Sequence, residues 1–355
     1  MDGVRIELLT PPWWFEEGRR IEVPHSAPWR VGRTLFTGNG TRHLYATGLL
    51  EAIRGARPDV IDLYEEPFSL VALQTLLARD MLAPRAALVF YSAVNVERVW
   101  RWPYRAIERL LLRRADGAHA PNSDVPRILR TKGFLHQPIS VIPLGVELER
   151  FKSAEAMQLP RIPRPRVGFV GRLEPVKGLD VLLDAFERLT TPASLVIAGE
   201  GSDRAKVLEA ASMPDSRVHL RPPLQFSELP AFLKALDVLV LPSVTIPPLH
   251  REQFGRILVE AMAAGVPVIG SSSGAIPEVI GDAGLVVPER DPRALAHAVE
   301  SVLGQADLRA TLVERGRQRV LGRYAWPRVA EQTLGLFQAA VARRRQIPTL
   351  QAVRV

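Results

Sequence analysis

Two glutamates, Glu252 and Glu260, stand eight positions apart around a glycine turn and the start of an apolar helical pattern. Gly255 between them lets the backbone approach a ligand, and the N–H groups at a helix start bind anions. A carboxylate pair accepts hydrogen bonds from hydroxyl groups, which a neutral apolar pocket cannot do. Small apolar residues follow Glu260, so we expect it to be buried and to need a partner. The alternative is a helix cap beside a solvated glutamate.

A second group of candidate residues follows the apolar run Arg166–Val170. Gly171 opens the turn after this run, and Arg172 and Lys177 come next. Ligands of open α/β sheets bind outside the carboxyl ends of the strands. An arginine fork and a lysine ammonium at this point can hold two phosphates, although a plain strand–loop–helix turn with two surface cations has the same residues. A further glycine turn, Gly199-Glu200-Gly201, follows the next apolar run.

Strand and helix patterns alternate along most of the chain, which indicates parallel sheets covered by helices. The strands predicted from apolar runs are Val4–Leu9, Asp59–Tyr64, Ala87–Tyr91, Ser140–Ile142, Arg166–Val170, Ser194–Ala198, Val218–Leu220, Val238–Leu241, Pro267–Gly270 and Leu285–Val287. Helices are predicted over Leu179–Leu189, Ser227–Ala235 and Ile257–Ala264. The expected fold class is therefore α/β, in two domains because 355 residues exceed one ordinary core.

A proline-rich stretch divides the chain. Residues 159–166 read Leu-Pro-Arg-Ile-Pro-Arg-Pro-Arg, and three prolines in so short a stretch cannot continue a helix or a central strand. We expect a first domain over residues 1–150, a linker over residues 151–166 and a second domain over residues 167–325. A C-terminal helix over residues 326–345 is expected to pack back on the first domain.

The composition is that of a globular protein, with 47% hydrophobic and 24% charged residues. The absence of cysteine excludes disulfides, thiolate metal sites and a cysteine nucleophile. A net charge of +8 favours anionic partners such as nucleotide phosphates or an acidic membrane face, whereas no nucleic-acid-binding motif is present. No apolar run approaches the roughly 18–20 residues of a membrane span, and the chain does not open on a signal peptide pattern. We expect a cytoplasmic protein, with peripheral membrane contact at most.

Four motifs come in the order and spacing seen in glycosyltransferase family 4, which the chain resembles. They are Gly171-Arg172-Leu173 with Lys177-Gly178, Gly199-Glu200-Gly201, the Glu252 and Glu260 pair, and Gly265-Val266-Pro267-Val268-Ile269 with Gly274 and Pro277-Glu278. Residues 167–326 resemble the donor domain of that family. The first half resembles it more loosely, through Pro58–Ile61, Glu65–Pro67 and Val141–Val146.

The resemblance implies a GT-B architecture, in which two Rossmann-like domains face a cleft. It also implies a retaining transferase that moves a sugar from a nucleotide-diphosphate donor to a hydroxyl of a sugar or lipid-linked acceptor, in cell-surface polysaccharide or glycolipid synthesis. The family normally needs no metal and no cofactor, because cations and a helix start neutralise the leaving diphosphate. The sequence agrees with this expectation, since it has no Asp-x-Asp after a strand and its seven histidines lack ligand spacing.

Roles for individual residues are also implied by the resemblance. Glu252 would contact the transferred sugar near the reacting carbon, as the catalytic residue, and Glu260 would bind the ribose hydroxyls. The donor-binding residues would be Arg172 and Lys177 at the diphosphate, and Phe254 and Gly255 through their backbone, with Gly171, Gly199 and Glu200 as further donor-loop candidates.

The first half departs from the family pattern in two places. Val4–Leu9 resembles the second strand of such domains and no glycine pair follows it, so we expect the first βα unit to be missing and an upstream extension to supply it. Alternatively, Val4–Leu9 is the true first strand, with Gly38-Asn39-Gly40 as a simple turn. The histidine that many relatives place after Ala87–Tyr91 is replaced here by Ser92-Ala93-Val94-Asn95, so no acceptor-side base is assigned.

Residues 100–114 carry a basic helical pattern. Pro103 suits a first helical position, and Arg105, Arg109 and Arg113 then recur every four residues behind two tryptophans. Such a helix could lie on an anionic membrane, although a surface helix with a solvated basic face is the alternative. Two other functions remain open: a nucleotide-sugar epimerase of the same architecture, and a non-catalytic member that only binds donor.

Overall fold

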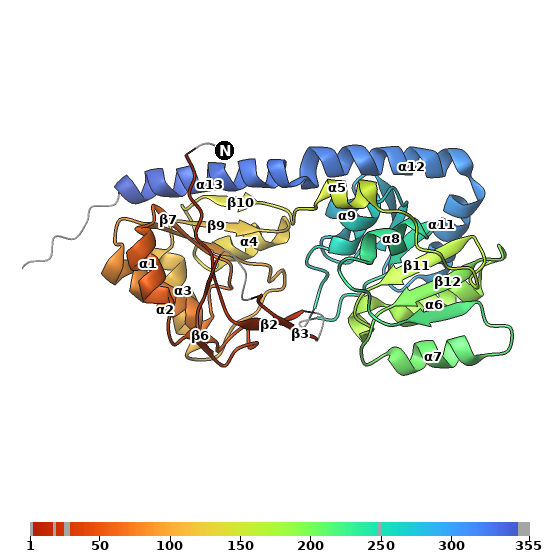
Figure 1. Ribbon diagram of the computed structural model, residues 1–355, viewed down its shortest axis with the longest axis horizontal. Coiled ribbons are helices and arrows are strands. Elements are labelled where there is room, and N and C mark those ends of the chain that lie inside the picture. Colours follow the sequence, from red (N-terminus) through yellow and green to blue (C-terminus); the bar gives the residue numbers. More distant parts are fainter. Residues whose placement is uncertain (1–2, 17–18, 25–28, 248–249, 347–355) are drawn as a thin grey trace, which may run out of the picture. The chain divides into compact units, whose positions relative to one another are not determined.

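The computed structural model describes residues 3–16, 19–24, 29–247 and 250–346, and it divides into two compact units (Figure 1). The first unit comprises Met1–Ile142 and Glu331–Val355, and the second comprises Pro143–Ala330. This division differs from the predicted boundaries at residues 150 and 166. Phe151 and Ile162 of the predicted linker are buried in the core of the second unit, because the Arg166 guanidinium binds the carbonyls of Leu159 and Ile162 and holds the proline-rich stretch against it.

The first unit is built on a four-stranded parallel sheet with the strand order β10-β9-β8-β7. Its strands are β7 (Val60–Leu63), β8 (Ala87–Tyr91), β9 (Gly117–Ala120) and β10 (Ile139–Val141). The helices of this unit are α1 (Leu49–Ala56), α2 (Leu70–Leu82), α3 (Tyr104–Arg114) and α4 (Asp124–Thr131). Apolar side chains of α2, α3 and α4 pack on one face of the sheet, and α1 packs beside α2.

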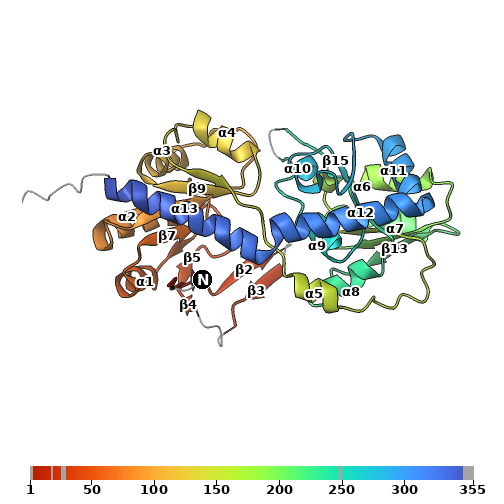
Figure 2. The same ribbon diagram turned by 90° about the horizontal axis from the view of Figure 1, so that it is seen from above.

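The other face of this sheet is partly covered by the C-terminal helix α13 (Trp326–Gln346), of which residues from 331 onward belong to the first unit. Figure 2 shows this helix passing over the sheet. Gly117 lets it approach, because a Cβ there would lie 3.4 Å from Leu336 and 3.5 Å from Ala340. Near the helix end, Arg344 donates a 2.6 Å hydrogen bond to the carbonyl of Pro84.

The N-terminal segment forms small sheets of its own. Parallel β1 (Leu9–Thr10) and β4 (Arg30–Val31), antiparallel β2 (Trp13–Glu16) and β3 (Arg19–Glu22), and antiparallel β5 (Thr34–Leu35) and β6 (Leu44–Tyr45) make three two-stranded pairs. The prediction of a strand over Val4–Leu9 was wrong, since only Leu9 belongs to one. Ile6 is 83% exposed, because no neighbouring strand in the described residues pairs with it or covers it. The cluster Gly38-Asn39-Gly40 is a turn in which the Asn39 side chain accepts from two backbone N–H groups.

The second unit contains a six-stranded parallel sheet with the strand order β13-β12-β11-β14-β15-β16. Its strands are β11 (Arg166–Val170), β12 (Ser194–Ala198), β13 (Val218–Arg221), β14 (Val238–Leu241), β15 (Val268–Ser271) and β16 (Gly284–Val287). The chain runs outward from β11 to β13, then returns to β14 and runs the other way. The strand order therefore reverses between β11 and β14, which is where ligands of doubly wound sheets bind.

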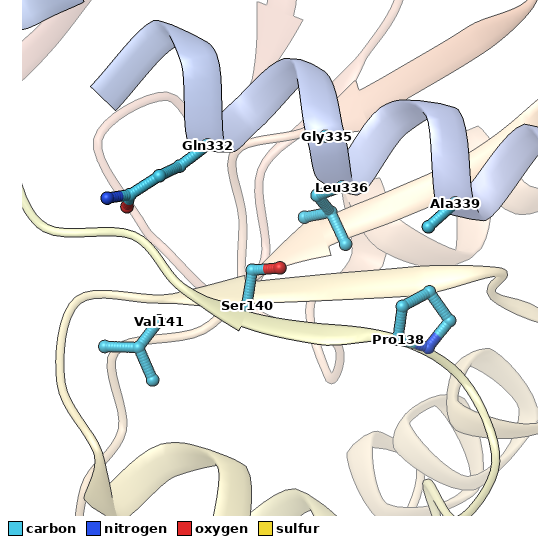
Figure 3. Close-up of a pocket in the computed structure, with 7 residues that line it drawn as sticks. All are labelled: Pro138, Ser140, Val141, Gln332, Gly335, Leu336 and Ala339. Carbon is cyan, nitrogen blue, oxygen red and sulfur yellow. The ribbon is translucent and has the colours of Figure 1, made fainter. Parts of the chain in front are cut away.

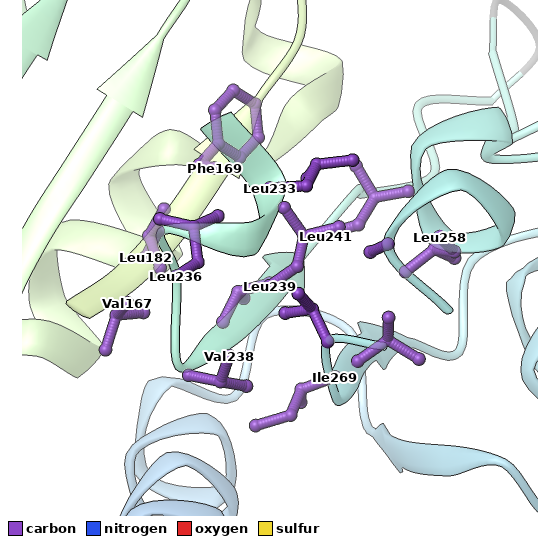
Figure 4. Close-up of a cluster of buried hydrophobic side chains, with 14 of the residues drawn as sticks. Val167, Phe169, Leu182, Leu233, Leu236, Val238, Leu239, Leu241, Leu258 and Ile269 are labelled. Carbon is purple, nitrogen blue, oxygen red and sulfur yellow. The ribbon is translucent and has the colours of Figure 1, made fainter. Parts of the chain in front are cut away.

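Helices surround this second sheet. They are α5 (Leu148–Ser153), the single turn Pro175–Lys177, α6 (Leu179–Glu187), α7 (Arg204–Ser212), α8 (Leu229–Lys234), α9 (Arg256–Ala263), α10 (Ile276–Ile280), α11 (Pro292–Gly304), α12 (Ala306–Arg319) and the π-helical turn Val320–Tyr324. Figure 4 shows the centre of the core, where side chains of β11 and β14 meet Leu233 of α8 and Leu258 of α9. A core of this kind fixes the ends of β11 and β14, from which the candidate site residues extend.

No helix in the described part of the chain is both long enough and apolar enough to cross a membrane.

Candidate functional site

The loops that follow β11 and β14 are locked together at the point where the strand order reverses. The Val244 N–H donates to the carbonyl of Val176, 2.9 Å away. Gly178 adopts a left-handed conformation, with φ of 70°, and a Cβ at this position would overlap the carbonyl oxygen of Pro242. Only glycine fits both demands. The contact places the predicted residue Lys177 beside the loop that leads to Glu252.

Lys177 and Glu252, which the sequence predicts for two different roles, form an ion pair. Lys177 Nζ lies 2.7 Å from Glu252 Oε2, and Ser243 Oγ donates to the same oxygen from 2.8 Å. The two side chains are 15% and 8% exposed. Burial opposes ionisation of Glu252, but the Lys177 charge and the bonds from Lys177 and Ser243 hold its pKa below the usual value. Glu252 is therefore an anion at neutral pH.

Arg172, the other predicted phosphate ligand, lies in a more open position. Its Nη1 is 2.9 Å from the Glu174 carboxylate, and the two side chains are 42% and 36% exposed. An exposed ion pair of this kind contributes little to stability, so the guanidinium can exchange Glu174 for a phosphate at small cost. Both predicted phosphate-binding cations thus hold a carboxylate of their own unit.

The predicted donor-loop residues Gly171, Gly199 and Glu200 adjoin the Arg172 loop. The Leu173 N–H donates to the Glu200 carbonyl at 2.8 Å, and a Cβ at Gly199 would overlap the carbonyl oxygen of Gly171. Glu200 points its side chain outward, where it lies 3.3 Å from Arg204. These residues shape the backbone around Arg172 rather than presenting side chains to it.

Helix α9 begins directly behind Glu252. Gly255 is its N-cap in a left-handed conformation, with φ of 79°, and Phe254 is buried edge-to-face against Tyr324, with ring centroids 5.9 Å apart. Glu260 is also buried, and Arg256 Nε lies 3.5 Å from its Oε1. The sequence correctly indicated a buried Glu260 with a partner. The side chain of Phe254 serves the core, so any ligand contact at this position would come from the backbone.

The backbone of Glu252 is itself fixed by the Gly274 turn. The Ala275 N–H donates to the Glu252 carbonyl at 2.9 Å, and a Cβ at Gly274 would overlap that carbonyl oxygen. In the loop before it, Thr245 Oγ1 and its N–H both donate to the Glu289 carboxylate at 2.6 Å. Glu289 therefore holds the Thr245 loop, a contact that the sequence did not predict because no local pattern marks Glu289.

His250 is a second missed residue of this loop. It forms a bridge with Ile246, each N–H donating to the other's carbonyl at 2.9 Å. Its Nε2 is buried and has no hydrogen-bond partner among the residues that the structure describes. Burial lowers the pKa of His250, so its ring is neutral at neutral pH. A buried polar atom without a partner two positions before Glu252 is a candidate ligand contact.

In the first unit, polar and aromatic side chains gather where the parallel strands end. The rings of Tyr64 and Tyr91 stack with centroids 4.3 Å apart, and His119 Nε2 lies 3.0 Å from Asp62 Oδ1. Tyr91 and His119 are register partners on neighbouring strands, and Ser140 is the next partner along the same row. A polar row on a sheet face is suited to binding hydroxyl groups.

Glu66 lies in the loop behind this row, where sequence reasoning assigned no base. Its carboxylate accepts hydrogen bonds of 2.7 Å from Ser92 Oγ and from the Ala93 N–H. Burial raises the pKa of Glu66 to about 7, although these hydrogen bonds oppose the rise. The adjacent Glu65 lies 3.2 Å from His43 Nε2.

A groove of about 420 Å³ adjoins the row (Figure 3). It lies between β10 and α13, with Ser140 and Gln332 as its polar side chains, and Gly335 leaves its wall open. Its size is that of a small-ligand site. Within the described residues, no three or more histidine, aspartate or glutamate side chains are grouped to hold a metal ion.

Two family models match this chain. The model described as Glycosyltransferase Family 4 matches residues 1–150, and the model described as Glycosyl transferases group 1 matches residues 164–305. The chain belongs to the family 4 glycosyltransferases. The resemblance drawn from the four sequence motifs is thereby confirmed, and the second match spans all of the predicted donor-site residues.

Curated relatives of this family 4 chain include glycosyltransferases with two different activities in their names. A D-inositol 3-phosphate glycosyltransferase of Xylanimonas cellulosilytica is 31% identical over 237 residues, covering 61% of this chain and 55% of the relative. A glycogen synthase of Mycobacterium tuberculosis is 35% identical over 225 residues, covering 59% and 50%. The chain spans about half the length of the curated relatives it matches.

Solved structures show the same fold. Sucrose-phosphate synthase from Thermosynechococcus elongatus superposes with a TM-score of 0.66 at 22% identity, covering 90% of this chain and 85% of that one. Anabaena HepE in complex with UDP also superposes with a TM-score of 0.66, at 18% identity and 82% coverage of each chain. The predicted α/β fold with two Rossmann-like domains of the GT-B kind is confirmed.

Proposed function

We propose that this chain is a retaining glycosyltransferase that binds a nucleoside diphosphate sugar in its second unit. The observation that carries the proposal is the ion pair of Lys177 with Glu252, beside Arg172, at the point where the sheet order reverses. Lys177 and Arg172 can hold a diphosphate at this place by exchanging their carboxylate partners for phosphate oxygens, and Anabaena HepE, which has the same fold, binds UDP.

Donor binding would rearrange this pair. The diphosphate brings two or more negative charges to Lys177 and Arg172, while Glu252 already has a second partner in Ser243. Glu252 would then face the sugar, where positive charge develops at the reacting carbon as the diphosphate leaves. The bond from that carbon to the phosphate oxygen breaks and a bond to the acceptor oxygen forms on the same face. The acceptor proton passes to the leaving phosphate, so no metal and no cofactor is required.

The nucleoside would be held at the start of α9. Glu260 is buried and ionisable, which suits it to accept hydrogen bonds from the two ribose hydroxyls, while the backbone at Gly255 lies next to the phosphates. His250 extends the site, because its unpartnered Nε2 can donate to a phosphate or a sugar hydroxyl.

The acceptor would be a hydroxyl of a sugar or of a lipid-linked sugar, bound by the first unit. The Tyr64 and Tyr91 stack offers a flat aromatic wall, and the pair of Asp62 and His119 offers hydroxyl partners. We place the reaction in the cytoplasm at the inner face of a membrane, in cell-surface polysaccharide or glycolipid synthesis. The excess of basic residues supports an anionic surface as a partner.

Slow donor hydrolysis tests the proposed reaction without a known acceptor. The protein is incubated with UDP-glucose, UDP-galactose, UDP-N-acetylglucosamine or GDP-mannose, and the released sugar is followed by proton NMR. We expect one donor to be cleaved with the α anomer appearing first, and Glu252→Gln to slow this cleavage by roughly 100-fold or more. Release of the β anomer would contradict retention, and cleavage of none of the four donors would contradict the proposed function.

A further inference from the structure

The loop before α3 and the outer side of α3 carry a concentration of positive charge. Five arginines are exposed within sixteen residues, and in the described part of the chain none of them forms an ion pair with a carboxylate. They are Arg98, Arg101, Arg105, Arg109 and Arg113. Arginines of a folded surface usually have acidic neighbours, so an unpaired group of this size indicates an anionic partner.

The acidic side chains nearby do not neutralise these arginines, because each is bound to another cation. Glu97 lies 2.8 Å from Arg127, and Glu108 is buried 2.6 Å from Lys132. On the neighbouring helix α2, Asp80 lies 2.7 Å from Arg114. The five arginines therefore add their full charge to this surface.

Large apolar side chains stand among the arginines. Trp102 is 84% exposed, Val99 is 76% exposed and Leu110 is partly exposed on α3. Trp100 behaves differently, since its ring packs on Phe68 with centroids 3.9 Å apart. That contact anchors the loop, so Trp102 and Val99 are held outward from a fixed base rather than on a free end.

Helix α2 continues the apolar part of the surface. Helices α2 and α3 lie side by side, and Asp80 of α2 pairs with Arg114 of α3. Leu77 and Met81, one turn apart on the outer side of α2, are 57% and 65% exposed. Leu77 lies three positions before Asp80 and Leu110 four positions before Arg114, so each leucine is about one helical turn from the ion pair between the two helices.

We propose that residues 98–102 with the outer sides of α2 and α3 form a surface that docks on an anionic lipid bilayer. We call it the docking surface. Tryptophan favours the interface between lipid headgroups and acyl chains, and arginines next to it bind anionic headgroups. The proposal deepens the membrane contact suggested above and does not depend on sugar transfer. It would bring the first unit, which we propose to bind the acceptor, to a lipid-linked acceptor.

A bilayer explains this surface better than a soluble polyanion does. Nucleic acid or an acidic polysaccharide would use the arginines but would leave Trp102, Val99 and Met81 in water. A bilayer uses both kinds of side chain, because the apolar groups insert among the acyl chains while the guanidinium groups stay at the phosphates. Removal of the Trp102 side chain should therefore weaken binding to a bilayer but not binding to a soluble polyanion.

The test is co-flotation of the 355-residue protein with vesicles of phosphatidylcholine alone or with 30% phosphatidylglycerol. We expect flotation only with phosphatidylglycerol, with release as the salt concentration rises from about 0.05 to 0.5 M. The triple variant Arg105→Gln/Arg109→Gln/Arg113→Gln should reduce the bound fraction at least fivefold, and Trp102→Ser at least twofold. The matched control Arg204→Gln/Arg293→Gln/Arg315→Gln removes the same charge from exposed positions of the second unit and should float like the parent protein.

Each other result overturns the proposal. Absence of the parent protein from the phosphatidylglycerol vesicles at low salt, or equal flotation of both triple variants, would exclude the docking surface. Unchanged flotation of Trp102→Ser together with equally tight binding to heparin would indicate a polyanion site instead. Melting temperature and UDP binding, measured on every variant, keep loss of folding and failure of the proposed donor site distinct from loss of docking.

Discussion

Lys177 Nζ and Glu252 Oε2 lie 2.7 Å apart, so the cation proposed for the diphosphate and the carboxylate proposed for the sugar neutralise each other before donor arrives. The pair is largely buried and Glu252 also accepts from Ser243. Because Ser243 remains a partner of Glu252, the diphosphate could take over Lys177 without leaving that carboxylate unpaired.

Removal of the lysine alone should destabilise the second unit. Lys177→Met leaves the Glu252 carboxylate buried without its cation, which we expect to lower the free energy of unfolding by about 1–3 kcal/mol, less than for a fully buried pair because both side chains keep some water contact. The double variant Lys177→Met/Glu252→Gln should recover most of this loss in stability, while its donor cleavage should stay at least roughly 100-fold slower than that of the parent protein. Urea unfolding of the parent protein, the two single variants Lys177→Met and Glu252→Gln, and the double variant measures these free energies. An equal loss of stability in Lys177→Met and in the double variant would contradict the prediction.

The raised pKa of Glu66 should make the stability of the protein depend on pH. Its pKa is raised to about 7 in the folded protein, above the ordinary value of 4.5, so the folded state binds its proton more tightly than the unfolded state does. This contribution is fully present below pH 4.5 and is lost as the pH rises through about 7. Glu66→Gln should therefore gain melting temperature relative to the parent protein between pH 5 and pH 8. Glu65→Gln is the matched control, and parallel pH curves for parent and Glu66→Gln would contradict the prediction.

Substitutions of Glu252 and Glu260 should change different kinetic constants. Glu260→Ala loses the proposed ribose contacts, which donor makes equally in ground state and transition state, so KM for the cleaved donor should rise with little change in kcat. Glu252→Gln loses stabilisation of charge that develops only in the transition state, so kcat should fall by roughly 100-fold or more. Steady-state cleavage of the donor measures both constants. A Glu252→Gln protein with normal kcat would remove its catalytic assignment.

His250 should take up a proton when the diphosphate binds. Burial lowers its pKa in the donor-free protein, and a phosphate at its unpartnered Nε2 would raise that pKa again. Calorimetry of UDP binding near pH 6 in buffers of different ionisation enthalpy should show proton uptake in the parent protein and less in His250→Gln. Equal proton uptake in both proteins would show that His250 does not face the phosphates.

Sequence patterns predicted the second unit well because its strands are covered on both faces. Such strands are continuous apolar runs, and Arg166–Val170, Ser194–Ala198 and Val238–Leu241 have the predicted bounds. In the first unit, β9 was missed, since Gly-Ala-His-Ala is neither β-branched nor strongly apolar. Val4–Leu9 was predicted as a strand from its apolar run, but a strand also needs a neighbour to pair with.

Sequence patterns marked individual residues of the candidate site but not their arrangement. Glycine turns and the Glu252 and Glu260 spacing marked the loops, whereas the contact of Lys177 with a carboxylate far along the chain depends on which strands lie side by side. His250 and Glu66 carry no local pattern. Their chemistry comes from burial, which a single sequence does not specify at loop positions.

Metal-free binding of UDP, measured by calorimetry with EDTA present, tests the central claim most directly. The parent protein should bind UDP, and Lys177→Ala should weaken binding by about 1.5–3 kcal/mol, the scale of a hydrogen bond to a charged group. Arg188→Ala, which removes an exposed arginine that follows α6 and pairs with Asp184, should bind like the parent. Undiminished UDP affinity in Lys177→Ala, or UDP binding by the parent protein only when a divalent metal is added, would contradict the donor site proposed for this chain.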